Sequence, residues 1–363
     1  MENEPNPAPE QKDIVKSPNR KLKRLVLKWL ILISAVLILT GGILFYLANL
    51  VWLRPNISAN DSAGISVYIP TGSTYDEVLT SLYSKDLVNR KWTFEWLARK
   101  KNYPALVKPG HYVFYDRMNN NEVINILRAG LQTPVHVVIN NVRLKQDLAR
   151  KIALQIEADS LSIITMLNDT DYLKKYNLRA EHAMILCIPN TYEFYWNTSA
   201  VQFFERMKNE YEKFWNGERQ KGLARTGLTR EEVITLASII EKETLKDDEK
   251  SRMAGVYINR LRKGWKLQAD PTVVYAAGDF TIRRVLNKHL AINSPYNTYM
   301  HFGLPPGPIC LPSIASIDAV LTYEENGYFY FCAKEDRSGY HNFARTYSEH
   351  LINARKYQRA LRQ

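Results

Sequence analysis

The longest uninterrupted apolar stretch of the chain lies near its N-terminus. No charged residue occurs from Trp29 to Leu53, and Leu30–Tyr46 is almost wholly apolar. A helix of this length crosses a bilayer core of about 30 Å. Trp29 and Trp52 stand at its two ends, as aromatic anchors do at membrane interfaces. The pattern predicts a transmembrane helix over residues 29–53, and a single span excludes a channel or a transporter.

The charges that flank this stretch predict its orientation. Residues 1–28 form a polar tail with five Lys and Arg between positions 20 and 28, whereas Arg54 is isolated and Asp61 is the next charge. The positive-inside rule then places the tail in the cytoplasm and the residues beyond the span outside it. The expected location is the cell inner membrane, with those residues in the periplasm. A cleaved signal peptide is the alternative, but the apolar run exceeds about 15 residues and no A-x-A site follows it. An uncleaved single-pass anchor is therefore expected.

Short strands alternate with amphipathic helices in the first part of the exported region. After a linker at residues 54–64, alternation predicts a strand over Ile65–Pro70, and Ser73 or Thr74 is placed to cap the helix that follows. A second strand and helix follow by the same criteria. Residues 65–130 resemble a LysM-type fold, a small α+β module that binds N-acetylglucosamine polymers. A packing module without glycan contacts is the alternative.

The same strand–turn–helix order returns in an intermediate segment, residues 131–225. Val135–Ile139 predicts a strand, and apolar spacings of four predict an amphipathic helix over Leu144–Ala158. The helix expected at 199–216 carries an aromatic stripe, and Pro189–Trp196 is the densest aromatic run. These aromatic side chains are expected to pack in a core, with a sugar-stacking platform as the alternative. The exported part is thus of the α+β class.

The amino-acid composition indicates which class of partner the protein binds. The chain has 363 residues, of which 45% are hydrophobic and 24% charged, so a packed core is expected. Its 49 Lys and Arg against 37 Asp and Glu give a net charge of +12, which favours an anionic partner. Outside the cytoplasm no nucleic acid is expected, so the charge points to the membrane or to a cell-wall polymer. The sequence lacks the glycine motifs of nucleotide sites, and its three cysteines form no C-x-x-C pair, so no cofactor and no metal are expected.

The segment from Thr229 to Thr244 carries the candidate chemistry. Thr229 and Glu232 form a capping box that starts a helix, and the apolar residues that follow recur at i, i+3, i+4 and i+7. Two carboxylates, Glu241 and Glu243, stand near its end, about 160° apart around the helix axis, on opposite sides of the apolar stripe. A carboxyl beside apolar neighbours has a raised pKa and serves as a general acid near neutral pH. The helix pattern does not choose between the two, and two solvated surface glutamates are the alternative.

Ala237–Thr244 resembles the signature of the MltG (YceG-like) endolytic peptidoglycan transglycosylases. The order and spacing of further blocks agree, so the resemblance is specific from about residue 184 to 358 and looser over 65–183. It implies a mixed α/β YceG-like catalytic domain at residues 226–363. The further matching blocks are Val256–Leu261, Leu267–Tyr275, Ser294–Tyr299, Gly303–Ile309 and Gly339–Phe343.

The resemblance also implies an activity. It makes the second glutamate of the Glu-Lys-Glu triplet, Glu243, the catalytic residue and leaves Glu241 in a supporting role. The implied reaction cleaves the β-1,4 bond between N-acetylmuramic acid and N-acetylglucosamine within nascent glycan strands. It leaves 1,6-anhydro ends, terminates the strand, and uses one glutamate first as acid and then as base, without a cofactor. Penicillin-binding proteins are the implied protein partners.

Polar residues in the matching blocks are the candidate substrate-binding groups. Lys242 and Arg260 are placed to meet substrate carboxylates, with solvated surface charge as the alternative, and His341 is expected to be structural. Asp270 precedes a proline, which is also the usual N-cap and N1 pair of a helix. At the level of function, a non-catalytic peptidoglycan-binding scaffold and a hydrolase are the alternatives. The four substrate-binding candidates are Gln268, Asp270, Asn297 and Tyr299.

Overall fold

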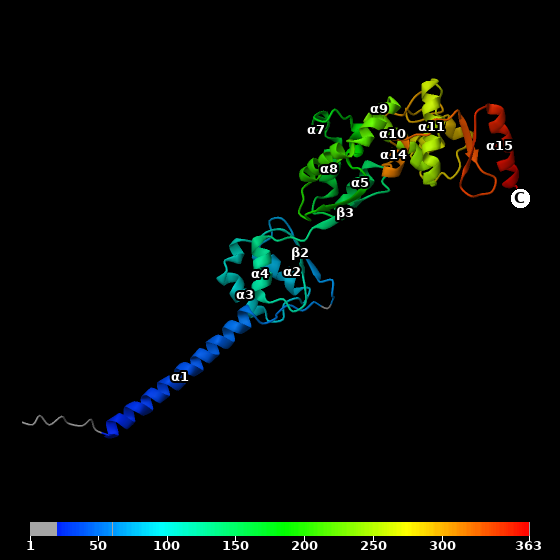
Figure 1. Cartoon of the computed structure of the whole chain (residues 1–363). Helices are drawn as coiled ribbons and strands as arrows, with labels where there is room; N and C mark the ends of the chain where they lie inside the picture. The colour runs from blue at the N-terminus through cyan, green and yellow to red at the C-terminus, as the bar shows by residue number, and fades with distance from the viewer. Residues whose placement is uncertain (1–19, 60, 363) are drawn as a thin grey trace, which may run out of the picture. The chain divides into compact units, whose positions relative to one another are not determined.

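The computed structural model describes residues 20–59 and 61–362, which form two compact units. Of the predicted cytoplasmic tail, residues 1–19 lie outside the described residues. Helices and short two-stranded sheets make up the chain (Figure 1), which confirms the expected mixture of helix and sheet. The first unit consists of the residues up to Val67, Thr74–Lys108 and Val113–Leu131, and the second of Tyr68–Ser73, Pro109–Tyr112 and the residues from Gln132 onward.

The N-terminal apolar stretch forms one long helix, α1 (Arg20–Trp52). Within it, Leu22–Trp52 is long and apolar enough to cross a membrane. The mean hydropathy of its most apolar part is 2.6, and none of that part is buried inside the structure. No other helix in the described part of the chain has these properties. The helix begins well before the predicted Trp29, because Lys, Arg and Leu are good helix formers. Such a helix fits a membrane anchor or a signal sequence.

Helices of the first unit pack around a buried polar cluster. Asn56 Nδ2 donates to Asn120 Oδ1 at 2.7 Å, and Asn120 Nδ2 donates to the carbonyl of Val51 at 3.0 Å. Both asparagines are fully buried, so these bonds satisfy groups that water does not reach. Thr74, one of the two predicted caps, begins α2 with a capping box. The elements of this region are β1 (Ile65–Ile69), α2 (Tyr75–Tyr83), α3 (Lys91–Lys100), η1 (Tyr103–Ala105), β2 (Gly110–Phe114) and α4 (Asn120–Ala129), and β1 pairs with β2.

The second unit begins with an antiparallel pair of strands and the helices next to it. β3 (Val135–Ile139) pairs with β4 (Asn190–Phe194). The aromatic stripe of α8 (Ala200–Phe214) is buried, which confirms its predicted place in the core. The predicted helix over 144–158 is too long: α5 ends at Ala153, because the Gln155 side chain leaves the helix to hydrogen-bond the backbone of β3. The other elements of this half are α5 (Lys145–Ala153), α6 (Ser160–Asn168), α7 (Thr170–Lys174) and η2 (Ala180–Leu186).

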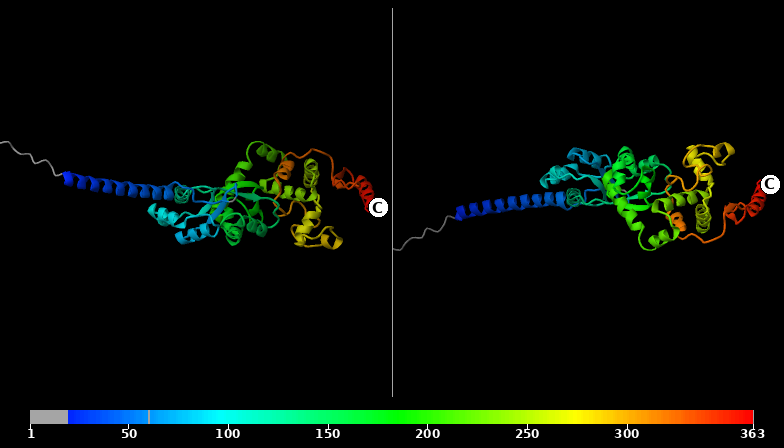
Figure 2. Two further views of the ribbon diagram at one scale, coloured as in Figure 1. Left: turned by 90° about the horizontal axis from the view of Figure 1, so that it is seen from below. Right: turned by 90° about the horizontal axis from the view of Figure 1, so that it is seen from above.

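The second half of this unit is built around α10 (Arg230–Glu243). Every residue from Val233 to Ile240 is buried, so the single apolar stripe expected from the sequence is too narrow a description. The reason is that α11, α12, α14 and η2 all pack against α10. In both views of Figure 2, the segment that follows α12 (yellow) and α15 (red) lie apart at the C-terminal end of the unit. The remaining elements are α9 (Glu218–Thr226), α11 (Asp247–Arg262), α12 (Asp270–Ala277), α13 (Asn287–Leu290), α14 (Ile314–Leu321), β5 (Tyr330–Ala333), β6 (His341–Ala344) and α15 (Tyr347–Ala360).

One hydrophobic core extends through both halves of the second unit, from Val137 to Tyr323. The predicted intermediate segment and the predicted catalytic domain, residues 131–225 and 226–363, are therefore packed together. The division between them at residue 225 stays a prediction. The shared core fixes the position of α10, whose C-terminal end carries the candidate acid.

Candidate active site

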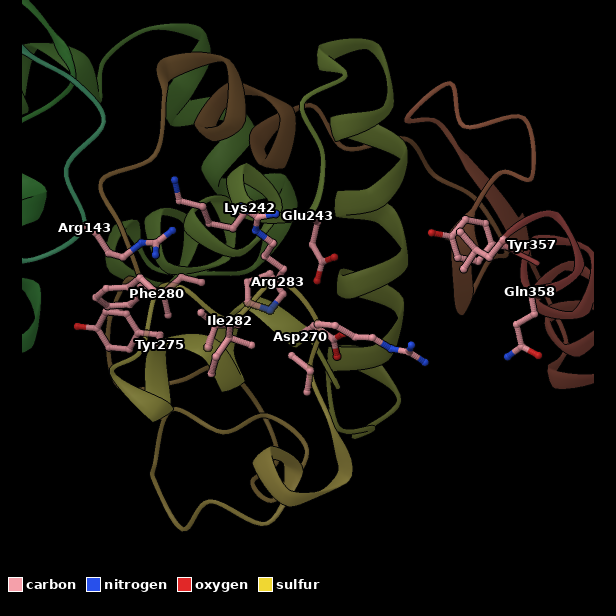
Figure 3. Close-up of a pocket in the computed structure, with 16 residues that line it drawn as sticks. Arg143, Lys242, Glu243, Asp270, Tyr275, Phe280, Ile282, Arg283, Tyr357 and Gln358 are labelled. Carbon is pink, nitrogen blue, oxygen red and sulfur yellow. The ribbon is translucent and has the colours of Figure 1, made fainter. Parts of the chain in front are cut away.

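A pocket of about 660 Å³ lies at the C-terminal end of α10 (Figure 3). Its lining contains two carboxylates, Glu243 and Asp270. Side chains from far apart in the sequence complete the wall, from Arg143, which precedes α5, to Leu361, which follows α15. The pocket is therefore formed only when the second unit has folded.

Glu243 is the last residue of α10, and Thr244 ends the helix by adopting an extended backbone. The carboxyl is partly buried and borders the pocket. Tyr257, which is buried on α11, donates its hydroxyl hydrogen to Glu243 Oε1 at 2.8 Å. Burial raises the pKa of Glu243 to about 7 although the Tyr257 hydrogen bond acts in the opposite direction. The pKa of Tyr257 is itself raised well above its usual value by burial, so its hydroxyl remains a donor.

Two further charges act on Glu243. The carboxylate of Asp270, at the start of α12, raises the pKa of Glu243, and the guanidinium of Arg260 lowers it. Arg260 is held in place by the carbonyls of Leu267 and Phe329, at 2.6 and 2.7 Å. These bonds commit two of its donors to the backbone, so Arg260 supplies a fixed positive charge near the acid.

Glu241 points to a different environment. Its Oε2 accepts hydrogen bonds from the hydroxyls of Ser313 and Ser316 and lies 3.4 Å from Nζ of the buried Lys250. Burial alone would raise the pKa of Glu241, but the two serine hydroxyls and Lys250 outweigh it and hold the pKa below its usual value. Glu241 therefore stays ionised and joins α10 to the N-terminus of α14. This geometry separates the two glutamates that the helix pattern left equivalent.

The four substrate-binding candidates have different surroundings. Asp270 lines the pocket, and Tyr299 donates its hydroxyl hydrogen to Asp270 Oδ1 at 2.6 Å. The helix begins one residue earlier than expected, since Ala269 rather than Asp270 is the N-cap of α12. Asn297 is fully buried, and its amide donates to the carbonyls of Leu290 and Ile292 at 3.0 and 2.8 Å. Its side chain is thereby committed to the loop.

Gln268 and His341 lie outside the pocket lining. Gln268 is exposed and has a positive φ of 53°, a strained backbone for a residue other than glycine, and its N–H donates to the carbonyl of Thr298 at 3.2 Å. His341 Nδ1 lies 2.9 Å from Oε2 of Glu249, which is buried. The contact of His341 agrees with its expected structural role.

Several groups of the site have no signal in a single sequence. Tyr257 lies on α11, the helix after Glu243, and only the packing of α11 on α10 brings its hydroxyl to the carboxyl. Phe280, Arg283 and Arg284 lie in a segment without helix or strand periodicity. No local pattern in the sequence therefore points to Tyr257 or to the three residues of this segment.

Comparison with known proteins gives consistent matches. The model of the YceG-like family matches residues 67–356. The endolytic murein transglycosylase of Bacillus subtilis (strain 168) is 29% identical over 340 residues, which cover 88% of this chain and 91% of that protein. That of Streptococcus pneumoniae serotype 2 is 26% identical over 381 residues, which cover 91% of this chain and 68% of that protein. A crystal structure of a yceG-like protein from Listeria monocytogenes, 28% identical, superposes with a TM-score of 0.55 over 80% of this chain and 99% of its own.

Proposed function

The chain belongs to the YceG-like family, and from this premise we propose that it is an endolytic peptidoglycan transglycosylase. It cleaves the β-1,4 bond between N-acetylmuramic acid and N-acetylglucosamine within glycan strands and leaves 1,6-anhydro ends. The names of the relatives from Bacillus subtilis and Streptococcus pneumoniae support the activity. The observation that carries the mechanism is Glu243, whose carboxyl has a pKa of about 7 at the edge of an open pocket. Such a group is both an acid and a base at neutral pH.

In the first step Glu243 acts as a general acid. Its proton passes to the oxygen that links the two sugars, and the bond from that oxygen to C1 of N-acetylmuramic acid breaks. The N-acetyl oxygen of the same sugar stabilises the positive charge that develops at C1. The carboxylate left on Glu243 is stabilised by the hydroxyl of Tyr257, which already donates to it at 2.8 Å.

In the second step the same carboxylate acts as a general base. It takes the proton of the C6 hydroxyl, whose oxygen attacks C1 and closes the 1,6-anhydro ring. No water is consumed, and Glu243 ends the cycle protonated, as it began. A pKa near 7 suits both steps, because neither form of the carboxyl is greatly favoured over the other.

A hydrolase is the second candidate, because Asp270 lines the same pocket as Glu243. Glycosidases that use water employ two carboxylates, about 5–10 Å apart. The hydroxyl of Tyr299 already occupies one oxygen of Asp270. We assign Asp270 to raising the pKa of Glu243 and to contacting sugar hydroxyls.

The apolar helix α1 is proposed to anchor the enzyme in the membrane where strands emerge. By the positive-inside rule, the basic residues before it support a cytoplasmic N-terminus and a periplasmic pocket. Penicillin-binding proteins are proposed as partners on the family resemblance alone. Glycan binding by residues 65–130 stays a prediction.

Product analysis tests the proposed reaction. The full-length chain in detergent micelles is incubated with uncrosslinked glycan strands, and the new ends are identified by mass spectrometry. Internal cleavage with 1,6-anhydro-N-acetylmuramic acid ends is the expected result. Reducing ends, which are one water heavier than anhydro ends, would contradict the proposal and show that the enzyme is a hydrolase. The absence of new ends would favour the non-catalytic scaffold.

A further inference from the structure

Four cationic side chains line the pocket that contains Glu243. They are Arg143, Lys242, Arg283 and Arg284. Within residues 20–59 and 61–362, none of the four forms an ion pair. Like charges that line one pocket repel one another, and an anion that enters the pocket relieves this repulsion.

The carboxylates of the pocket neutralise only part of this positive charge. Glu243 is uncharged when it is ready to act as an acid, so Asp270 supplies one negative charge against four positive ones. Asp270 and Arg260 are the charges that act most on Glu243, and those of Arg143 and Lys242 act on the thiol of Cys310. Part of the positive charge therefore lies to one side of the acid.

Arg143 is held in a position to bind an anion. Its guanidinium lies over the ring of Phe280, 4.3 Å from the ring centre. Figure 3 shows Arg143 beside Phe280 and Tyr275, on the side of Glu243 away from Gln358 of α15. A guanidinium fixed against a ring keeps its N–H donors available at the edge and matches the planar geometry of a carboxylate.

We propose that Arg143, Lys242, Arg283 and Arg284 form a subsite for the carboxylates of the peptide carried by the glycan strand. The inference rests on the proposed function, because the substrate is then known to be peptidoglycan. The sugar rings of such a strand are neutral, and the lactyl carboxyl of N-acetylmuramic acid is used up in its amide bond to the peptide. The anionic groups nearest to the scissile bond are thus the peptide carboxylates. The subsite is expected to bind strands with free peptide carboxylates more tightly than strands without peptides or strands whose peptide carboxylates are capped.

Binding measurements on an inactive protein test the subsite without depending on cleavage. Full-length Glu243→Gln protein in micelles is titrated with lipid-free, uncrosslinked, peptide-bearing strands whose amines have been acetylated. A second sample of the same strands has its carboxylates converted to N-methylamides. Free carboxylates are expected to bind about tenfold more tightly than capped ones, with a difference that shrinks as salt is added.

Two double variants in the same background locate the effect. Arg283→Gln with Arg284→Gln leaves Arg143 and Lys242 in place and is expected to reduce the preference from about tenfold to about threefold, with binding of capped strands unchanged. Lys263→Gln with Lys288→Gln removes the same charge from two exposed residues outside the pocket lining and retains the preference. A titration with strands stripped of peptide, whose lactyl carboxylates are free, separates the two sources of carboxylate and is expected to show binding as weak as that of capped strands.

Three results would overturn the subsite: equal binding of free and capped strands, an unchanged preference in the Arg283/Arg284 variant, or an equal loss in the Lys263/Lys288 control. Tight binding of peptide-stripped strands would assign the cations to the lactyl group instead. Failure of the proposed function is seen separately, since wild-type protein would then release no anhydro ends from the same strands, whatever the binding preference.

Discussion

Glu241 and Glu243 lie two residues apart on α10, yet their carboxyls contact different groups. Glu241 accepts hydrogen bonds from two serine hydroxyls and lies beside Lys250. Glu243 faces a pocket and accepts a hydrogen bond from one tyrosine hydroxyl. The pKa is lowered at Glu241 and raised to about 7 at Glu243. At the residue scale, the environment beyond the helix decides which glutamate is able to donate a proton.

Replacing Tyr257 by Phe tests how the pKa of Glu243 is set. The Tyr257 hydroxyl favours the ionised carboxyl, so its loss raises the pKa of Glu243 further and keeps the acid form to higher pH. We expect the alkaline limb of the kcat/KM profile to move to higher pH. We also expect kcat at pH 7 to fall about tenfold, because the carboxylate formed in the first step loses a hydrogen bond. An alkaline limb at the wild-type position would remove Tyr257 from the mechanism.

The raised pKa of Glu243 also has a consequence for stability. The folded protein holds this proton to about pH 7, whereas the unfolded chain releases it near 4.5, so the associated stability is present below pH 4.5 and is lost as the pH rises through 7. Between pH 5 and 8 the free energy of unfolding of the wild type is expected to fall by about 2 kcal/mol more than that of Glu243→Gln, after allowance for partial exposure. Denaturant unfolding at both pH values measures the difference. Parallel pH dependences of the two proteins would show that Glu243 titrates normally.

At the scale of elements, Glu241 is expected to stabilise the packing of α14 on α10. Glu241→Gln leaves the buried Lys250 without this partner and weakens the cap of α14, at a cost of about 2 kcal/mol in the free energy of unfolding at pH 7. The lowered pKa of Glu241 means that the cost is greatest above the usual glutamate pKa and disappears as the pH falls. Chemical denaturation at pH 7 and pH 3 tests the sign. A variant as stable as the wild type at pH 7 would contradict the assigned contact.

The elements show what a sequence pattern determines and what it leaves open. The capping box at Thr229 and the period of α10 were predicted, because both depend on neighbouring residues alone. The burial of α10 on all sides was missed, since it depends on helices that arrive from elsewhere in the chain. The end of α5 was missed for a similar reason, as Gln155 bonds to a strand that precedes the helix.

At the scale of the whole chain, the candidate acid was found through a family resemblance and the pocket only through the structure. The helix pattern placed Glu241 and Glu243 on equal terms, and the resemblance chose Glu243. Arg143 and the residues of α15 line the pocket only because the second unit folds in this way. No spacing of neighbouring residues in the sequence predicts that they belong to the site. Asn297 was selected as a polar residue in a matching block, but its side chain is committed to its own loop.

Membrane attachment is a prediction about the whole chain. If α1 is an uncleaved anchor, the full-length protein stays in the membrane fraction after extraction with alkaline carbonate and with high salt. Intact mass analysis of the recovered protein is expected to include residues 29–53. Release as a soluble chain that lacks α1 would identify the segment as a signal sequence.

The central claim is that Glu243 supplies the proton for bond cleavage. Glu243→Gln and the control Glu218→Gln, which alters an exposed glutamate on α9, are assayed with wild type on uncrosslinked strands at pH 6, with the fold checked by circular dichroism. We predict that Glu243→Gln forms 1,6-anhydro ends about a thousandfold more slowly while the control retains the wild-type rate. Anhydro ends released by folded Glu243→Gln at the wild-type rate would contradict the account.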